Sequence, residues 1–268
     1  MVDFQCKERY DYADLLQIMK LLRSPGGCPW DREQTHASIR RNFLEETCEA
    51  VEAIDQADMA GLCEELGDVL MQVVFHAQIE EEQGGFTMAD VVDGVCRKLV
   101  YRHPHVFGSV QADTSDQVLA NWEVLKRKEK HQQSTADAVD AVAKTLPALW
   151  RAEKMQSKAA KAGFCWPSDQ GALDKLSEEV EELRAAVAAG GPPEAPHGIR
   201  EEVGDVLFMA AKVARDHGVD PEEALHRSCD KFARRFRSVE TDAGPRPLGE
   251  LSTEELLRLW DQAKEKES

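Results

Sequence analysis

The sequence has few of the residues from which β-sheets are built. Only 6% of its residues are aromatic, and runs in which Val, Ile, Thr and Tyr alternate with polar residues are scarce. Ala, Glu, Leu, Lys and Arg are abundant instead, and these residues favour helices. With 268 residues and a hydrophobic content of 42%, the chain is long enough for two modest helical domains. We therefore expect an all-α fold.

Signals for export, membranes and disulfides are also missing. The seven cysteines are an odd number and include no C-x-x-C pair, so neither a disulfide framework nor a zinc site is predicted. Residues 1–5 lack the basic and apolar regions of a signal peptide. No apolar stretch reaches the length that spans a bilayer. A cytoplasmic protein without a membrane partner is expected.

Basic residues are outnumbered, with 33 Lys and Arg against 50 Asp and Glu and a net charge of −17. Such a balance argues against a nucleic-acid polymer as partner. A small phosphate-bearing substrate remains compatible if a metal and local cations offset the repulsion. The chain has no G-x-x-x-x-G-K loop, which argues against a P-loop enzyme.

Apolar periodicity and capping signals predict two consecutive sets of helices. The predicted ranges are 10–22, 35–56, 59–82, 88–102 and 116–130, then 146–162, 170–189, 197–217, 221–241 and 253–264. Residues 28–31 and 104–108 are expected to be loops. A polar, alanine-rich stretch between the two sets is interpreted as a linker. The predicted domains are therefore 1–131 and 145–268, joined by 132–144.

The two halves repeat the same motifs in the same order. The matched pairs are Cys28–Asp31 with Cys165–Ser168, Glu45–Glu49 with Glu178–Glu182, Glu64–Asp68 with Glu201–Asp205, Lys98-x-x-x-Arg102 with Lys231-x-x-x-Arg235, and Trp122-x-x-x-Lys126 with Trp260-x-x-x-Lys264. Each match alone is weak, but five in register indicate a tandem duplication.

Each half carries two acidic pairs whose members are three residues apart and so share a helix face. The pairs are Glu46/Glu49 and Glu65/Asp68 in the first half, and Glu179/Glu182 and Glu202/Asp205 in the second. Two such helices packed antiparallel would gather four carboxylates, which repel one another unless a cation lies between them. Oxygen ligands of this kind suit Mg²⁺, Mn²⁺ or Ca²⁺. The alternatives are a solvated acidic face and a salt bridge to a basic side chain.

The helical segments around the second acidic pair of each half are apolar nearly all round. We therefore expect Asp68 and Asp205 to be largely buried and to have a partner. Gly67 and Gly204 lie next to these aspartates. Because glycine inside a helix costs about 1 kcal/mol relative to alanine, a neighbouring helix or ligand is expected to approach them closely.

Basic and aromatic residues near these motifs have two interpretations. Lys98 with Arg102, and Lys231 with Arg235, lie four apart on a helix and could hold phosphate oxygens, or could be ordinary surface charge. Lys175 lies one turn before the acidic motif and could also reach a phosphate. Trp260 could stack on a base or anchor the core.

Taken together, the chain resembles the MazG family of nucleoside triphosphate pyrophosphohydrolases. The carrying motifs are the two acidic pairs in each half, Cys28–Asp31 with Gln34–His36, Tyr101–Gly108 and Lys231–Phe236. The resemblance implies all-α units of four to five helices that dimerise into bundles, as a homodimer or higher homo-oligomer. It implies hydrolysis of NTPs or dNTPs to a monophosphate and pyrophosphate, with Mg²⁺ or Mn²⁺, by water attack at the α-phosphorus. Such an enzyme would clean or control the nucleotide pool.

The resemblance also implies roles for individual residues, with the C-terminal half as the main catalytic unit. The implied metal ligands are Glu179, Glu182, Glu202 and Asp205, and in the first half Glu46, Glu49, Glu65 and Asp68. The implied nucleotide contacts are Lys175, Glu178, Lys231, Arg234, Arg235 and Trp260, and in the first half Lys98 and Arg102. Glu178 or Glu45 could orient or deprotonate the attacking water. The rival interpretations are a regulatory protein that binds a guanosine polyphosphate without hydrolysing it and a metal-binding or dimerisation module.

Overall fold

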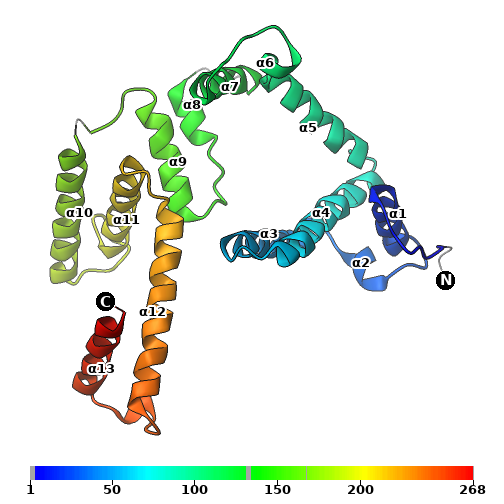
Figure 1. Ribbon diagram of the computed structural model, residues 1–268. Coiled ribbons are helices and arrows are strands. Elements are labelled where there is room, and N and C mark those ends of the chain that lie inside the picture. The colour runs from blue at the N-terminus through cyan, green and yellow to red at the C-terminus, as the bar shows by residue number, and fades with distance from the viewer. Residues whose placement is uncertain (1–3, 131–133, 167, 268) are drawn as a thin grey trace. The chain divides into compact units, whose positions relative to one another are not determined.

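The structure is a computed structural model that describes residues 4–130, 134–166 and 168–267, and every regular element in these residues is a helix (Figure 1). The chain divides into two compact units, residues 1–126 and 127–268. The predicted linker, 132–144, begins slightly after this division, and residues 131–133 at its start lie outside the described residues. Within the described residues, no helix is both long and apolar enough to cross a membrane.

The first unit is organised around its longest helix. The helices are α1 (Tyr12–Arg23), α2 (Pro29–Glu33), α3 (Arg40–Asp55), α4 (Met59–Glu82), α5 (Met88–Arg102), α6 (Pro104–Phe107) and α7 (Ser115–Glu129), which runs across the division. Helices α1, α3 and α5 all pack against α4 (Figure 1). The buried core, made of Met19, Ile39, Val74, Phe75 and Ile79, lies towards the C-terminal half of α4. This leaves the N-terminal half of α4 to pair with α3.

The second unit is built around two helix pairs. Its helices are α8 (Thr135–Asp140), α9 (Ala148–Ala160), α10 (Asp169–Ala189), α11 (Ile199–Asp216), α12 (Pro221–Ala243) and α13 (Thr253–Lys266), with a 3-10 turn at Leu248–Glu250. Helix α10 packs on α11, and α13 packs on α12 (Figure 1). The buried core residues Val239, Ala243, Leu251, Leu259 and Ala263 join α12 to α13.

Among the described residues, each unit contains five helices of more than ten residues. They are α1, α3, α4, α5 and α7 in the first unit and α9 to α13 in the second. This order confirms the predicted tandem all-α architecture of four to five helices each. The predicted ranges 59–82 and 88–102 coincide with α4 and α5. Strong N-caps explain this agreement, because Asp58 and Thr87 each accept hydrogen bonds from backbone N–H groups of the first turn.

Three short helices lie where loops or a linker were predicted. Helices α2 and α6 begin at Pro29 and Pro104, because a proline in the first turn has a backbone angle suited to a helix and lacks only an N–H that would be unsatisfied there. Helix α8 begins in the predicted linker, where the Ser134 side chain and Asp137 form a capping box. The loop prediction at 28–31 and 104–108 was therefore wrong.

The predicted burial of the acidic segments holds only in part within a single chain, since Phe75 and Met209 are buried and Asp68 is half-buried. Leu66 is 54% exposed, Leu207 is 49% exposed, and Asp205 is exposed. The helices that pack on α4 (α1, α3 and α5) and on α11 (α9, α10 and α12) leave these positions open to solvent. A Cβ atom added to Gly67 or Gly204 would meet nothing within 4 Å. The chain itself therefore does not supply the close neighbour that these glycines led us to expect.

Candidate metal centres

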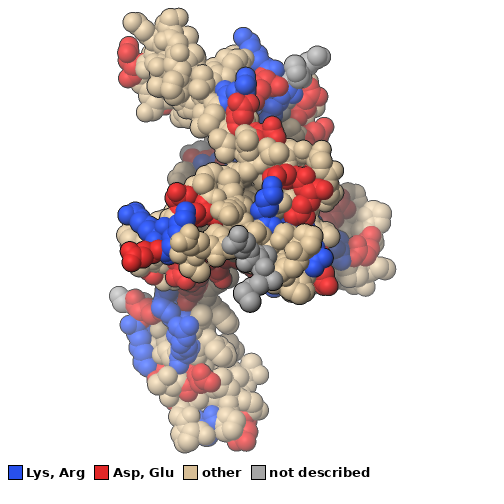
Figure 2. All heavy atoms as spheres, turned by 90° about the vertical axis from the view of Figure 1, so that its right-hand side faces the viewer, with Lys and Arg blue, Asp and Glu red and all other residues tan. Residues whose placement is uncertain are grey.

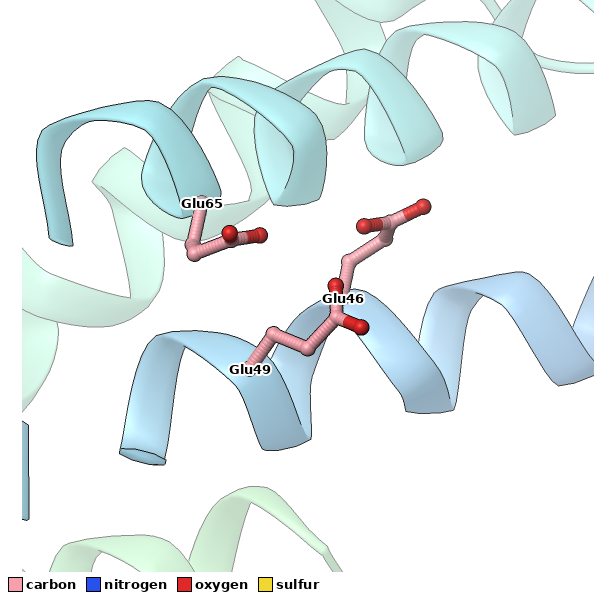
Figure 3. Close-up of side chains that lie close together, drawn as sticks. All are labelled: Glu46, Glu49 and Glu65. Atoms are coloured by element: carbon pink, nitrogen blue, oxygen red, sulfur yellow. The ribbon is translucent and has the colours of Figure 1, made fainter. Parts of the chain in front are cut away.

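The N-terminal carboxylates converge between α3 and α4. The chain reverses at Ala57, which has a left-handed φ of 54°, so that the two helices run antiparallel. Glu46 and Glu49 of α3 then face Glu65 of α4, and one carboxylate oxygen of each lies within 4.8 Å of the others (Figure 3). We call these three residues the N-terminal cluster. The structure thus brings together three of the four predicted carboxylates of the first unit.

The fourth predicted ligand, Asp68, lies close enough to act on the cluster electrostatically. Burial raises the pKa of Glu46 above its ordinary value, and the negative charges of Asp68 and Glu49 raise it further. Burial likewise raises the pKa of Glu65, followed by the charges of Glu49 and Asp68. These directions mean that the carboxylates repel one another, and a cation placed among them would remove that repulsion.

Gln72, which was not predicted from the sequence, contacts the N-terminal cluster through Glu46. It lies four residues after Asp68 on α4, is only 5% exposed, and donates a hydrogen bond to Glu46. Its carbonyl oxygen Oε1 is buried and has no hydrogen-bond partner in the described part of the chain. A buried oxygen without a donor is unusual in a folded protein. The spacing of four residues from Asp68 is the signal that could have identified it.

The C-terminal carboxylates meet in the same way between α10 and α11. One oxygen each of Glu179, Glu202 and Asp205 lies within 4.8 Å of the others, and we call these residues the C-terminal cluster. Glu179 and Glu202 are 7% and 4% exposed. Glu182 forms a hydrogen bond with Glu179, and burial followed by this bond raises its pKa. Burial, followed by the charge of Glu179, raises the pKa of Asp205.

Two basic side chains contact the C-terminal cluster. Nζ of Lys175 lies 2.9 Å from Oε1 of Glu179 and 3.0 Å from Oε1 of Glu178. The hydrogen bonds to these two carboxylates raise the pKa of Lys175, so it stays protonated. Nδ1 of His197 lies 3.8 Å from Oε1 of Glu202. The contact of His197 was not predicted, because it depends on the loop before α11 and no motif marks it.

The donor atoms fit a hard divalent cation. In the part of the chain that the structure describes, these two clusters are the groups of three or more potential ligands that lie close enough to hold one ion. All six side chains offer carboxylate oxygen, which Mg²⁺ and Mn²⁺ prefer, and none is the Cys or His ligand typical of zinc sites. The orphaned oxygen of Gln72 beside Glu46 adds a further hard donor, directly or through a bound water. The residues present therefore fit the ion that the resemblance implies.

Apart from Lys175, the predicted phosphate-binding residues lie on α5 and α12, and the arginines among them have other partners. The guanidinium of Arg102 is buried and lies 5.3 Å from the ring centre of Trp122. Arg235 and Arg234 lie 2.7 and 3.6 Å from the carboxylate of Glu267. Lys98 is half-buried and Lys231 is exposed. On the face shown in Figure 2, basic side chains gather over α12 and α13 at the bottom of the view. In the described residues, none of these ion pairs joins the side chains of α5 and α12 to the two clusters.

The contacts of Trp260 agree with one of the two roles predicted for it, that of a core anchor. Its half-buried ring packs on the core between α12 and α13. It also lies 5.1 Å, between ring centres, from Phe232, which stacks in turn on Phe236 at 5.9 Å. Phe232 is 57% exposed. The group therefore presents an open aromatic surface beside the arginines of α12.

Comparisons with known proteins agree with this arrangement. The model of the MazG nucleotide pyrophosphohydrolase domain matches residues 34–107 and 168–239, and these two segments contain the two clusters. A nucleoside triphosphate pyrophosphohydrolase of Escherichia coli is 41% identical over 94% of this chain and 97% of its own length. A nucleoside triphosphate pyrophosphohydrolase/pyrophosphatase MazG of Thermotoga maritima is 40% identical over 94% and 95%. The uncharacterized protein YabN of Bacillus subtilis is 45% identical over 96% of this chain, which spans only 52% of that relative.

Proposed function

This chain belongs to the MazG nucleotide pyrophosphohydrolase family, and on that premise we propose that it hydrolyses nucleoside triphosphates to nucleoside monophosphates and pyrophosphate with Mg²⁺. The observation that carries the proposal is the convergence of carboxylate oxygens within 4.8 Å in both units. Each convergence lies in a segment matched by the family model. Relatives that this chain covers over 95% or more of their length are named for this activity.

The carboxylates are proposed to hold Mg²⁺ and position the triphosphate. Glu179, Glu182, Glu202 and Asp205 would hold the ion in the C-terminal unit, and Glu46, Glu49, Glu65 and Asp68 in the N-terminal unit. When bound, the ion lowers the pKa of a water molecule and offsets phosphate charge. Mn²⁺, with similar oxygen preference, would substitute. The acidic clusters would repel a polyphosphate without the ion.

Other side chains of the C-terminal unit are proposed to direct the reaction. Glu178, exposed and 3.0 Å from Lys175, would accept the proton of the attacking water at its carboxylate oxygen. Lys231, Arg234 and Arg235 would neutralise the charge that develops on the leaving pyrophosphate. Trp260 would stack on the base. Lys98 and Arg102 would serve as the phosphate contacts of the N-terminal unit.

A homodimer is part of the proposal. The apolar side chains that remain exposed on α4 and α11, which include Leu66 and Leu207, would be buried by a second copy of the chain. The same second copy would lie against the open positions Gly67 and Gly204. All seven cysteines are free thiols, which suits the reducing cytoplasm, where nucleotide-pool control would take place.

The proposal is tested by a panel of NTPs and dNTPs with Mg²⁺, in which pyrophosphate and inorganic phosphate are measured separately. Pyrophosphate as the main product is expected, and inorganic phosphate would contradict attack at the α-phosphorus. Glu202→Gln with Asp205→Asn should abolish turnover by the C-terminal unit, and Glu65→Gln with Asp68→Asn tests the N-terminal unit. Nucleotide binding without any pyrophosphate would favour the regulatory interpretation.

A further inference from the structure

The two units share the four aligned carboxylates of the acidic pairs, but the basic side chains beside those carboxylates differ. Aligning the first acidic motifs places Lys175 at the position of Asn42, and aligning the second places His197 at the position of Ala60. In the described part of the chain, Glu46, Glu49 and Glu65 form no ion pair, whereas Glu179 pairs with Lys175 at 2.9 Å and Glu202 lies 3.8 Å from His197. The C-terminal cluster is therefore paired with a positively charged side chain, Lys175, whereas the N-terminal cluster has no such partner in the described residues.

The ammonium of Lys175 lies on a carboxylate oxygen of Glu179, which is one of the proposed metal ligands. Glu179 is only 7% exposed, so its carboxylate has little water around it and depends on a nearby partner. A protonated lysine at 2.9 Å supplies that partner when no metal is bound. A divalent ion that binds the Glu179 carboxylate is repelled by this ammonium, because two cations held by one carboxylate lie close together.

The N-terminal cluster uses a neutral group in the corresponding space. Gln72 donates a hydrogen bond to Glu46, while the aligned residue in the second unit is Met209, which is 3% exposed and has no donor. An amide orients the carboxylate without reducing the negative charge of the cluster. A divalent ion can therefore bind there without displacing a cation.

We propose that Lys175 is an internal counter-ion that holds the C-terminal cluster in the absence of metal and is displaced from Glu179 when a divalent ion binds, whereas the N-terminal cluster takes the ion without competition. The displaced ammonium then becomes available to a phosphate group. This inference rests on the proposed function, since it assigns a metal to the same carboxylates.

The test measures Mn²⁺ binding by calorimetry in the full-length chain without nucleotide. One background carries Glu65→Gln and Asp68→Asn, which leaves the C-terminal cluster as the metal site. There, Lys175→Met should raise the Mn²⁺ affinity about tenfold, since the competing ion pair is gone. Lys154→Met is the matched control, because Lys154 is an exposed lysine of α9 whose removal changes the net charge equally. It should leave the affinity unchanged.

The reciprocal test uses a background with Glu202→Gln and Asp205→Asn. There, Asn42→Lys should lower the Mn²⁺ affinity of the N-terminal cluster by a similar factor, because it installs the missing cation. This second background also covers the case in which Lys175→Met fails to fold, which circular dichroism reveals by loss of the helical signal.

Several outcomes would overturn the inference. An affinity that falls or stays constant in Lys175→Met, or that rises equally in Lys154→Met, would show that Lys175 does not compete with the ion. Absence of Mn²⁺ binding in both backgrounds would have the same consequence. Hydrolysis is measured separately: the expected affinity changes without pyrophosphate release would reject the proposed function alone, and pyrophosphate release without the affinity changes would reject this inference alone.

Discussion

Glu46→Gln is expected to stabilise the metal-free N-terminal unit and to destabilise the same unit when Mg²⁺ is bound. The Glu46 carboxylate lies within 4.8 Å of those of Glu49 and Glu65, and in the absence of a cation these charges repel. Glutamine has nearly the same shape and its carbonyl oxygen can still accept the hydrogen bond from Gln72. The substitution therefore removes one charge and one metal ligand, and little else.

The size of the effect follows from the distance and the exposure. Two unit charges 4.8 Å apart repel by about 0.9 kcal/mol in a water-like dielectric. Glu46 is half-buried, and solvent screening limits the total gain from removing its charge to about 1 kcal/mol. In saturating Mg²⁺ the sign reverses, because a weaker ion-binding site contributes less stabilisation to the folded state.

The raised pKa of Glu46 adds a pH dependence to this prediction. A carboxyl group whose pKa is higher in the folded state than its ordinary value of 4.5 favours folding in its protonated form. That contribution is fully present below pH 4.5 and is lost as the pH rises through the folded-state pKa. Without metal, the wild-type unit should therefore lose stability over this range, while Glu46→Gln should lose less.

Native-state hydrogen exchange of peptides from α3 and α4, in EDTA and in Mg²⁺, measures this unit separately from the other. Glu45→Gln is the matched control, since Glu45 is the adjacent glutamate, lies outside the cluster and pairs with Arg41 at 2.7 Å. Glu45→Gln should leave the Mg²⁺ dependence unchanged. Faster exchange in Glu46→Gln under both conditions would refute the reasoning, because it would mean that Glu46 stabilises the unit by packing.

Two further predictions concern α4. Nδ1 of His76 lies 2.7 Å from Nδ1 of His36, and burial followed by the charge of His36 lowers the pKa of His76 below 6.5. Stability should therefore be lost as the pH falls from 6.5 through the folded-state pKa, and His76→Gln should flatten this dependence in urea unfolding followed across that range. Leu66→Lys places a charge at an exposed apolar position of α4 and should convert the proposed homodimer to monomer in light scattering, where an unchanged mass would contradict the proposed interface.

The helices and the grouping of carboxylates could be predicted because both depend on local spacing. Asp58 and Thr87 cap their helices through residues two and three positions away, and residues three apart share a helix face whatever surrounds them. The exposure of Leu66 and Asp205 could not be predicted in this way. An apolar pattern shows that a face is suited to burial, but whether that face is covered depends on helices distant in the sequence or on another chain.

The electrostatic differences between the two clusters could not be predicted from the sequence for another reason. A duplication is recognised from the residues that the copies share, and the positions that decide the electrostatics here are those at which they differ. Lys175 and Asn42 both lie four residues before the first ligand of their motif, and Gln72 and Met209 both lie four residues after its last aspartate. Residues at this spacing project from the same helix face as the ligands. Because the affinity for an ion depends on every charge near it as well as on its ligands, two identical motifs with different residues at these positions should not bind metal equally.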